Sequence, residues 1–108
     1  MILDSGNIAE AFQLLVKICK ERKYLKLQQA IHDSYLDLIS VEAEARRKKS
    51  SSLIKGMQAI DRNMVLLNHE YEKVKRDFQI NAIPYFDQFI SEISQERKKL
   101  ALLKDRLK

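Results

Sequence analysis

Residues 53–78 read LIKGMQAIDRNMVLLNHEYEKVKRDF, and apolar side chains recur in this stretch at alternating intervals of four and three residues. This is the spacing of the a and d positions of a heptad repeat, which form one stripe on a helix and bury it against another helix. The stripe, which we call the first seam, consists of Leu53, Met57, Ile60, Met64, Leu67, Tyr71, Val74 and Phe78. The pattern predicts a helix over 53–81 that packs on a partner helix or on a second copy of the chain.

A second stripe with the same spacing lies around and beyond Pro84. This second seam consists of Ala82, Phe86, Phe89, Ile93, Glu96, Leu100, Leu103 and Leu107. Two successive steps of four residues, from Phe78 to Ala82 to Phe86, put the two seams out of register by one residue. Proline removes a backbone donor and clashes with the preceding helical turn. We therefore expect a bend or a break at 82–84, and the sequence leaves both open.

Breaker residues are scarce over the whole chain of 108 residues, which has two glycines and one proline. So few turn residues exclude a β-sandwich or a barrel, and this length suits one domain over 1–108. The expected elements are a helix over about 8–49, a turn at about 50–52, a helix over about 53–81 and a helix over about 84–107. The fold class is then all-α, either a long antiparallel helical hairpin or a three-helix bundle, with heptad seams and a bend or break at Pro84.

The first expected helix carries apolar residues on more than one stripe. One heptad stripe, the first-helix stripe, consists of Ile8, Ala11, Leu15, Ile18, Arg22, Leu25, Gln29, His32, Leu36, Ile39, Ala43 and Arg46. Other large apolar residues, such as Phe12, Tyr35 and Leu38, lie off this line. A helix of this kind needs more than one neighbour, from its own chain or from another. One interpretation of His32 is a polar core residue that sets the register of the packing.

Residues with catalytic or metal-binding spacing are scarce. Neither His32 nor His69 belongs to a His-x-x-x-His or Glu-x-x-His pair, the spacings that place two ligands on one helical face, and no phosphate-binding glycine loop or zinc spacing is present. We therefore expect no enzyme, catalytic residue, metal, cofactor or small-molecule substrate. Cys19 is the only cysteine and lies in an apolar run, which favours a buried packing thiol. Without a visible signal peptide or spanning segment, the expected location is the cytoplasm.

Basic residues outnumber acidic ones by 20 to 15, which gives a formal charge of +5. The densest basic run is Arg46, Arg47, Lys48 and Lys49, at the end of the first expected helix. Such a charge attracts anionic membrane surfaces and nucleic acid, although acidic residues are interleaved along the whole chain. The run is therefore a candidate anion-binding tip. It supports one hypothesis of function, a basic helical module that binds an anionic membrane surface or nucleic acid.

The densest aromatic patch follows the proline and comprises Tyr85, Phe86 and Phe89, with Ile90 beside them. It fits either a packed corner of the bundle or a docking surface, because aromatic residues dominate binding hot spots. Two apolar seams without catalytic chemistry favour a different hypothesis of function from the basic tip. This is a non-enzymatic coiled-coil interaction or scaffold module that forms a homodimer or docks a helical protein partner.

Overall fold

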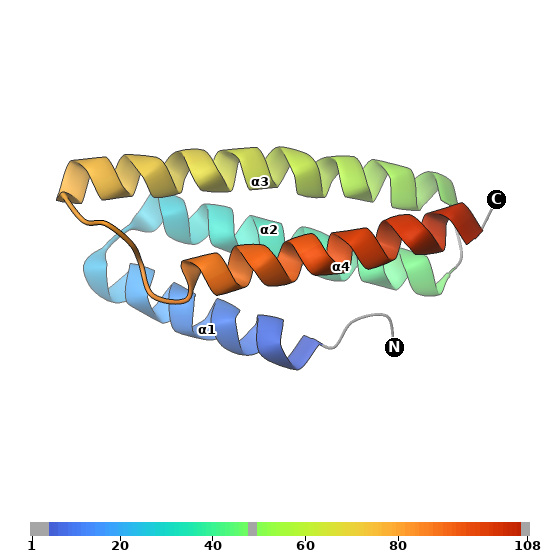
Figure 1. The fold of residues 1–108 in the computed structure, drawn as a ribbon, viewed down its shortest axis with the longest axis horizontal. Helices are drawn as coiled ribbons and strands as arrows, with labels where there is room; N and C mark the ends of the chain where they lie inside the picture. The colour runs from blue at the N-terminus through green and yellow to red at the C-terminus, as the bar shows by residue number, and fades with distance from the viewer. Residues whose placement is uncertain (1–4, 48–49, 107–108) are drawn as a thin grey trace.

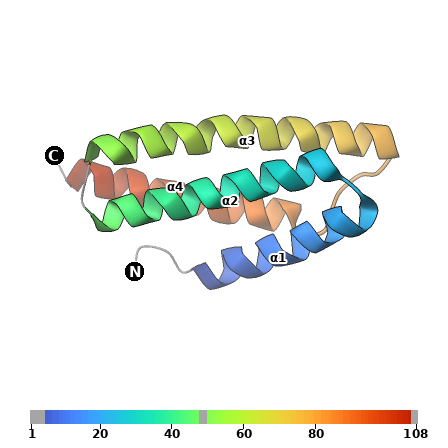
Figure 2. The same cartoon turned by 180° about the vertical axis from the view of Figure 1, so that it is seen from behind.

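The computed structural model describes residues 5–47 and 50–106, and within them the side chains of 8–47 and 51–106. This part of the chain forms four helices and no strand: α1 (Ser5–Arg22), α2 (Leu25–Arg46), α3 (Ser50–Phe78) and α4 (Phe86–Arg106). Successive helices run in opposite directions and form an up-and-down bundle (Figure 1). The view from behind shows α2 and α3 side by side along most of their length, with α1 below them (Figure 2). The expected all-α class is confirmed, with four helices where three were expected.

The first expected helix is interrupted at Lys23 and Tyr24, which we call the elbow, so one helix over 8–49 is wrong. α1 ends in a left-handed turn, with Lys23 at a φ of 62° and the Tyr24 N–H donating to the Cys19 carbonyl at 2.8 Å. This is the arrangement of a Schellman cap, whose left-handed residue is usually glycine. Packing is the physical reason for the break, because the turn lets α1 fold back and bury Ile8 and Cys19.

The turn between α2 and α3 comes earlier than expected. α2 ends at Arg46, and the N–H of Arg47 donates to the Glu44 carbonyl at 3.1 Å. α3 already begins at Ser50, so the expected turn at 50–52 is wrong, and residues 48–49 lie outside the described residues. Serine costs only a few tenths of a kcal/mol in a helix. The three serines therefore start α3 instead of interrupting it.

α3 ends at Phe78, before the expected boundary at 81. Gln79 takes a φ of 55°, and the N–H of Ile80 donates to the Lys75 carbonyl at 3.0 Å. α3 thus ends in the same left-handed cap as α1, again with a residue other than glycine.

Pro84 lies in a tight turn within the non-helical connection over 79–85. The N–H of Phe86 donates to the Ile83 carbonyl at 3.2 Å, and Tyr85 between them has a φ of 69°. Proline followed by a residue of positive φ is the pattern of a type II turn. α4 consequently begins at Phe86 and not at the expected residue 84.

Tyr71 of α3 ties this connection to the bundle. Its hydroxyl oxygen accepts a buried hydrogen bond from the N–H of Ile83 at 3.2 Å, and its ring stacks on Phe86 with 3.6 Å between the centroids. The Nζ of Lys75 lies 4.5 Å from the centroid of the same ring. One first-seam residue therefore satisfies a buried backbone donor and positions the start of α4.

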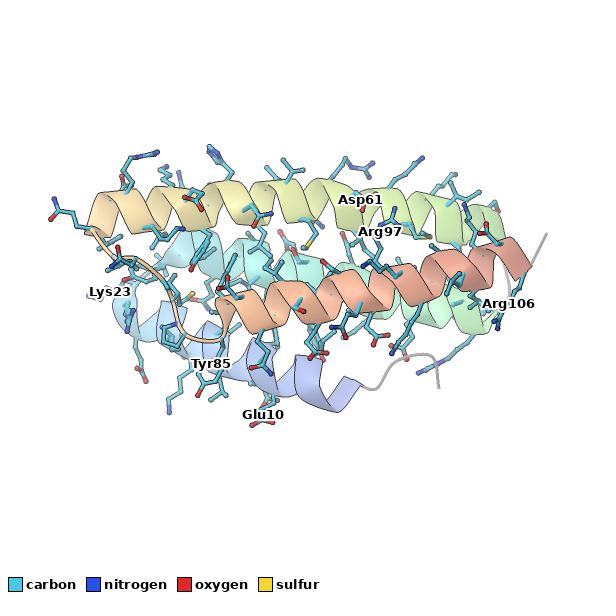
Figure 3. All side chains as sticks on the ribbon, viewed as in Figure 1. Glu10, Lys23, Asp61, Tyr85, Arg97 and Arg106 are labelled. Carbon is cyan, nitrogen blue, oxygen red and sulfur yellow. The ribbon has the colours of Figure 1, made fainter. Side chains whose placement is uncertain are left out.

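An ion pair bridges the outer side of α3 and α4. Two nitrogens of Arg97 lie 2.6 and 2.7 Å from the two carboxylate oxygens of Asp61, and the side chains point toward one another in Figure 3. Hydrogen bonding from Arg97 lowers the pKa of the Asp61 carboxyl. The carboxylate is half exposed, so we expect the pair to orient the two helices with little effect on stability.

α2 and α3 are in close contact at Gly56. A Cβ atom added there would overlap the Cγ2 methyl of Val41 and lie 3.2 Å from its Cβ. Two helical turns further along α3, Asn63 donates a hydrogen bond to the carboxylate of Asp37 on α2. Glycine is thus required at position 56 by contact with the neighbouring helix, since its backbone φ is ordinary for a helix.

Candidate interaction surfaces

The two seams are largely buried within the chain itself. Among the residues expected to contact a partner, those that are buried here are Leu53, Met57, Ile60, Leu67, Tyr71, Val74, Phe86, Phe89, Ile93 and Leu100. Met64 and Leu103 are half-buried, whereas Phe78 and Ala82 are exposed; Leu107 lies outside the described residues. Most seam residues are therefore covered by other helices of the same chain, with α2 as the main neighbour of α3.

The polar member of the second seam, Glu96, is 3% exposed. One of its carboxylate oxygens accepts from Lys99 at 3.1 Å, and the other has no hydrogen-bond partner. A second buried glutamate, Glu42 of α2, pairs with Arg46 one turn later. Each of the two carboxylates thus has a basic side chain of its own helix as its ion-pair partner.

The first-helix stripe is buried in α1 and exposed in α2. Leu25, Leu36 and Ile39 are 68%, 55% and 43% exposed, and α2 instead buries the residues Leu27, Ile31, Ser34, Leu38, Val41, Glu42 and Ala45. His32 is exposed and packs its ring against the edge of Phe12 at 5.1 Å between centroids. Its interpretation as a core residue is therefore wrong, because the elbow rotates α2 onto another face.

The candidate anion-binding tip is only partly described. Arg46 and Arg47 are exposed at the end of α2, where Arg46 pairs with Glu42 and Arg47 lies 3.3 Å from Glu44. Lys48 and Lys49 lie outside the described residues. Both arginines thus share their charge with a carboxylate on the preceding turn.

The aromatic patch after the proline divides between core and surface. Phe86 and Phe89 are buried, and the Phe89 ring lies 6.3 Å from that of Phe12 in α1. Tyr85 is 43% exposed and Ile90 is half-buried. Most of the patch is therefore a packed corner of the bundle.

A groove that the sequence does not predict lies beside the elbow, between the start of α2 and the end of α3. Its volume is about 230 Å³, and its lining residues are Lys23, Tyr24, Leu25, Lys26, Leu27, Glu70, Lys73, Val74, Asp77 and Phe78. We call it the elbow groove. Figure 3 places Lys23 at this end of the bundle.

The floor of the elbow groove is apolar, and two large apolar side chains lie exposed in its lining. Tyr24, Leu27 and Val74 are buried, whereas Leu25 and Phe78 are 68% and 54% exposed. The rings of Tyr24 and Phe78 lie 4.7 Å apart between centroids. Phe78 is thus anchored on one side and open to solvent on the other.

The charges around the elbow groove are unevenly balanced. Lys23, Lys26 and Lys73 form no ion pair within 4.0 Å in the described part of the chain. Of the two acidic lining residues, Asp77 lies 3.9 Å from Arg76 outside the groove. Glu70, the other acidic lining residue, likewise forms no ion pair within 4.0 Å among the described residues, so three lysines and one carboxylate without ion pairs surround two exposed apolar side chains. The sequence contains both features, but the elbow that brings them together has no breaker residue to reveal it.

A second groove of about 340 Å³ lies between α3 and α4. Ile60, Met64 and Ile93 line it, and the ion pair of Asp61 with Arg97 lies on the same lining. Of its apolar lining, Ile60 and Ile93 are already buried in the core and Met64 is half-buried, so none of these side chains is as exposed as Leu25 or Phe78 of the elbow groove.

Cys19 is fully buried at the end of α1. Burial raises the pKa of its thiol from 9.0 to about 11, although the nearby charge of Arg22 acts in the opposite direction. Nucleophilic cysteines are thiolates with lowered pKa values. The thiol therefore packs in the core as expected.

The raised pKa of Cys19 predicts a loss of stability at alkaline pH. A thiol with a higher pKa in the folded state contributes stability that is complete below pH 9 and is lost as the pH rises through about 11. Over this range we expect the free energy of unfolding of the wild type to fall by about 2 kcal/mol more than that of Cys19→Ala. Urea denaturation at a series of pH values measures both, and parallel curves would contradict the assignment.

No family model, curated protein or solved structure matches the chain. None of the helices described here combines the length and apolar character needed to cross a membrane. In the same residues, no group of three or more His, Cys, Asp or Glu side chains is arranged to hold a metal ion. A functional interpretation therefore depends on the surface of the bundle.

Proposed function

We propose that the protein is a non-enzymatic interaction module that docks a helical protein partner in the elbow groove. The observation that carries the proposal is the convergence of Leu25 and Phe78, both large and more than half exposed, on one groove with an apolar floor. Exposed apolar side chains that gather in one patch are typical of docking surfaces. The lone thiol of Cys19 suits a reducing compartment such as the cytoplasm.

The size of the elbow groove favours a protein partner. Small-molecule sites usually measure about 300–1,000 Å³, and this groove measures about 230 Å³. Such a space suits one or two large apolar side chains that project from a helix at intervals of three or four residues. The surrounding Lys23, Lys26 and Lys73 favour acidic residues on the flanks of that helix.

In this proposal the heptad seams act as a scaffold. Packing of the first seam of α3 against α2 holds these two antiparallel helices side by side, which keeps the two sides of the groove in place. The surface that binds then shares only the last two first-seam residues, Val74 and Phe78, with the seams.

A library of displayed helical peptides tests the proposal. We expect the selected peptides to be acidic, with large apolar residues three or four positions apart. Phe78→Ser should weaken their binding about thirtyfold or more, as for a hot-spot residue, and Leu25→Ser should weaken it as well. The matched control Val65→Ser changes a residue that is 69% exposed on α3 but outside the groove. Peptides that bind equally well to Phe78→Ser and Val65→Ser would exclude the elbow groove as the site.

The basic tip supports a second candidate function, binding of an anionic membrane surface or nucleic acid. The supporting observation is the exposure of Arg46 and Arg47, whose side chains are 56% and 67% accessible at one end of the bundle. Binding of this kind weakens steeply with salt. Phosphatidylserine vesicles and a DNA duplex are the probes. Salt-sensitive binding that is lost when both arginines are changed to glutamine would favour this candidate, and binding that ignores salt would exclude it.

A further inference from the structure

The elbow forms where the sequence favours an uninterrupted helix. Residues 20–26 read KERKYLK and contain no glycine, proline or serine. Lys23 nevertheless takes a left-handed φ of 62°, a conformation that lysine adopts at a cost. Tyr24, the cap residue of α2, makes no side-chain hydrogen bond to the helix that it begins. Tertiary packing of α1 therefore holds the elbow bent against the local preference of the chain.

The exposed apolar residues of α2 continue the buried stripe of α1. In one straight helix, Leu25, Leu36 and Ile39 would fall in line with Ile8 and Leu15 on the first-helix stripe. In the bent chain Ile8 and Leu15 are buried, whereas these three residues are 43% to 68% exposed. The first-helix stripe is thus continuous only in a straight α1–α2 helix, whereas α2 of the bent chain buries another stripe.

We propose that the elbow straightens, joining α1 and α2 into one helix over 5–46, and that two copies of the chain then exchange α1. The released α1 of each copy would fill the corner of the bundle that the other copy has vacated, beside α2 and α4. A helix over 5–46 is about 63 Å long, long enough to reach through both bundles.

The contacts of α1 show why a second copy is the occupant of the vacated corner. Phe12 stacks on Tyr35 of α2 at 4.1 Å and approaches Phe89 of α4 at 6.3 Å between centroids. Phe12 lies eleven residues before Lys23, and Tyr35 lies eleven residues after Tyr24. Two straight helices that cross in antiparallel directions at the elbow would therefore bring Phe12 of one copy back against Tyr35 of the other. Every contact of α1 is recovered, and Leu25 near the crossing gains an apolar neighbour.

Substitutions at position 23 separate the bent and the straight chain. Glycine adopts a positive φ without steric strain and is disfavoured inside a helix, so it favours the bent chain over the straight one. Lys23→Gly should therefore raise the dissociation constant of the dimer about tenfold or more. Valine is strongly disfavoured at positive φ, so Lys23→Val should lower the dissociation constant of the dimer. Lys17→Gly is the matched control, because Lys17 is exposed within α1 in both forms. Size-exclusion chromatography with light scattering, after refolding at a series of protein concentrations, measures these constants.

A distance measurement identifies the exchanged dimer directly. Spin labels are placed at Glu10→Cys and Ser40→Cys in a Cys19→Ala chain, both labelled positions being exposed, and the labelled chain is diluted in unlabelled chain. In the bent form the labels lie on neighbouring antiparallel helices about 20 Å apart, whereas in a straight helix they lie about 45 Å apart. We expect the longer distance in the dimer fraction. A dimer that keeps the shorter distance would overturn the proposal, as would a Lys23→Val chain that stays monomeric at every concentration.

Discussion

Replacement of Leu67 by aspartate is expected to unfold the whole chain. Leu67 lies near the middle of α3, the longest described helix, and its side chain is 0% exposed. Truncation of a buried leucine already costs about 2–5 kcal/mol, and a carboxylate without a partner adds the cost of its desolvation. Domains are stable by only about 5–15 kcal/mol in total. Far-ultraviolet circular dichroism of Leu67→Asp should therefore show the loss of most helical signal at 25 °C.

Val65→Asp is the control for this substitution, because it introduces the same charge two residues earlier in the same helix. Val65 is 69% exposed, so we expect its free energy of unfolding to stay within about 0.5 kcal/mol of the wild type. A different result is expected if the first seam contacts a partner chain instead of the chain's own core. Leu67→Asp would then keep its helicity and lose only the partner, which would contradict the packing described here.

The helical character of the chain could be predicted because it depends on local properties. The seams alternate at heptad spacing in stretches of good helix formers, and the core uses Leu53, Leu67 and Ile93 as this pattern requires. What the pattern could not specify is the neighbour. A heptad stripe packs equally well against another chain and against another segment of its own chain, and the short α2–α3 and α3–α4 connections decide for the latter.

The elbow could not be predicted, because its cause is distant in the sequence. A left-handed lysine costs about 1–2 kcal/mol, whereas the burial of Ile8, Leu15 and Cys19 returns several kcal/mol. A rule based on local helix propensity includes only the cost of the left-handed lysine and not the burial of these distant residues. One signal was present: large apolar residues such as Leu27 and Leu38 lay off the first-helix stripe, and these are the residues that α2 buries.

The elbow groove could not be predicted either, because it too depends on contacts between residues that are distant in the sequence. Lys23 and Lys26 belong to a basic cluster on the first expected helix, and Phe78 was assigned to the first seam. More than fifty residues separate these two parts of the chain, and they meet only because the elbow turns Tyr24 onto the Phe78 ring. Phe78 also lies in the last turn of α3, where the core no longer covers a heptad position.

Gly56→Val is expected to lower the free energy of unfolding by about 3 kcal/mol, at the upper end of the usual cost of overpacking. A Cβ at this position would already overlap a methyl group of Val41, and valine adds two more methyl groups. Val41 is itself β-branched and stiff at χ1, so it cannot rotate away at low cost. By local propensity alone valine is slightly better than glycine inside a helix. A loss of stability would therefore report the contact between α2 and α3.

A double-mutant cycle isolates this contact. Val41→Ala alone should cost about 1–2 kcal/mol, because it removes two methylene-sized groups from a residue that is 3% exposed. In the Val41→Ala chain the space that it leaves accepts the valine at position 56, so the double variant should be more stable than Gly56→Val alone. We expect a coupling energy of about 2–3 kcal/mol between the two positions, measured by urea denaturation of all four chains. Additive effects would show that the valine at 56 meets some other neighbour and that α2 and α3 do not approach each other here. The elbow groove lies between the same two helices, so the cycle also tests the α2–α3 packing that holds its two sides together.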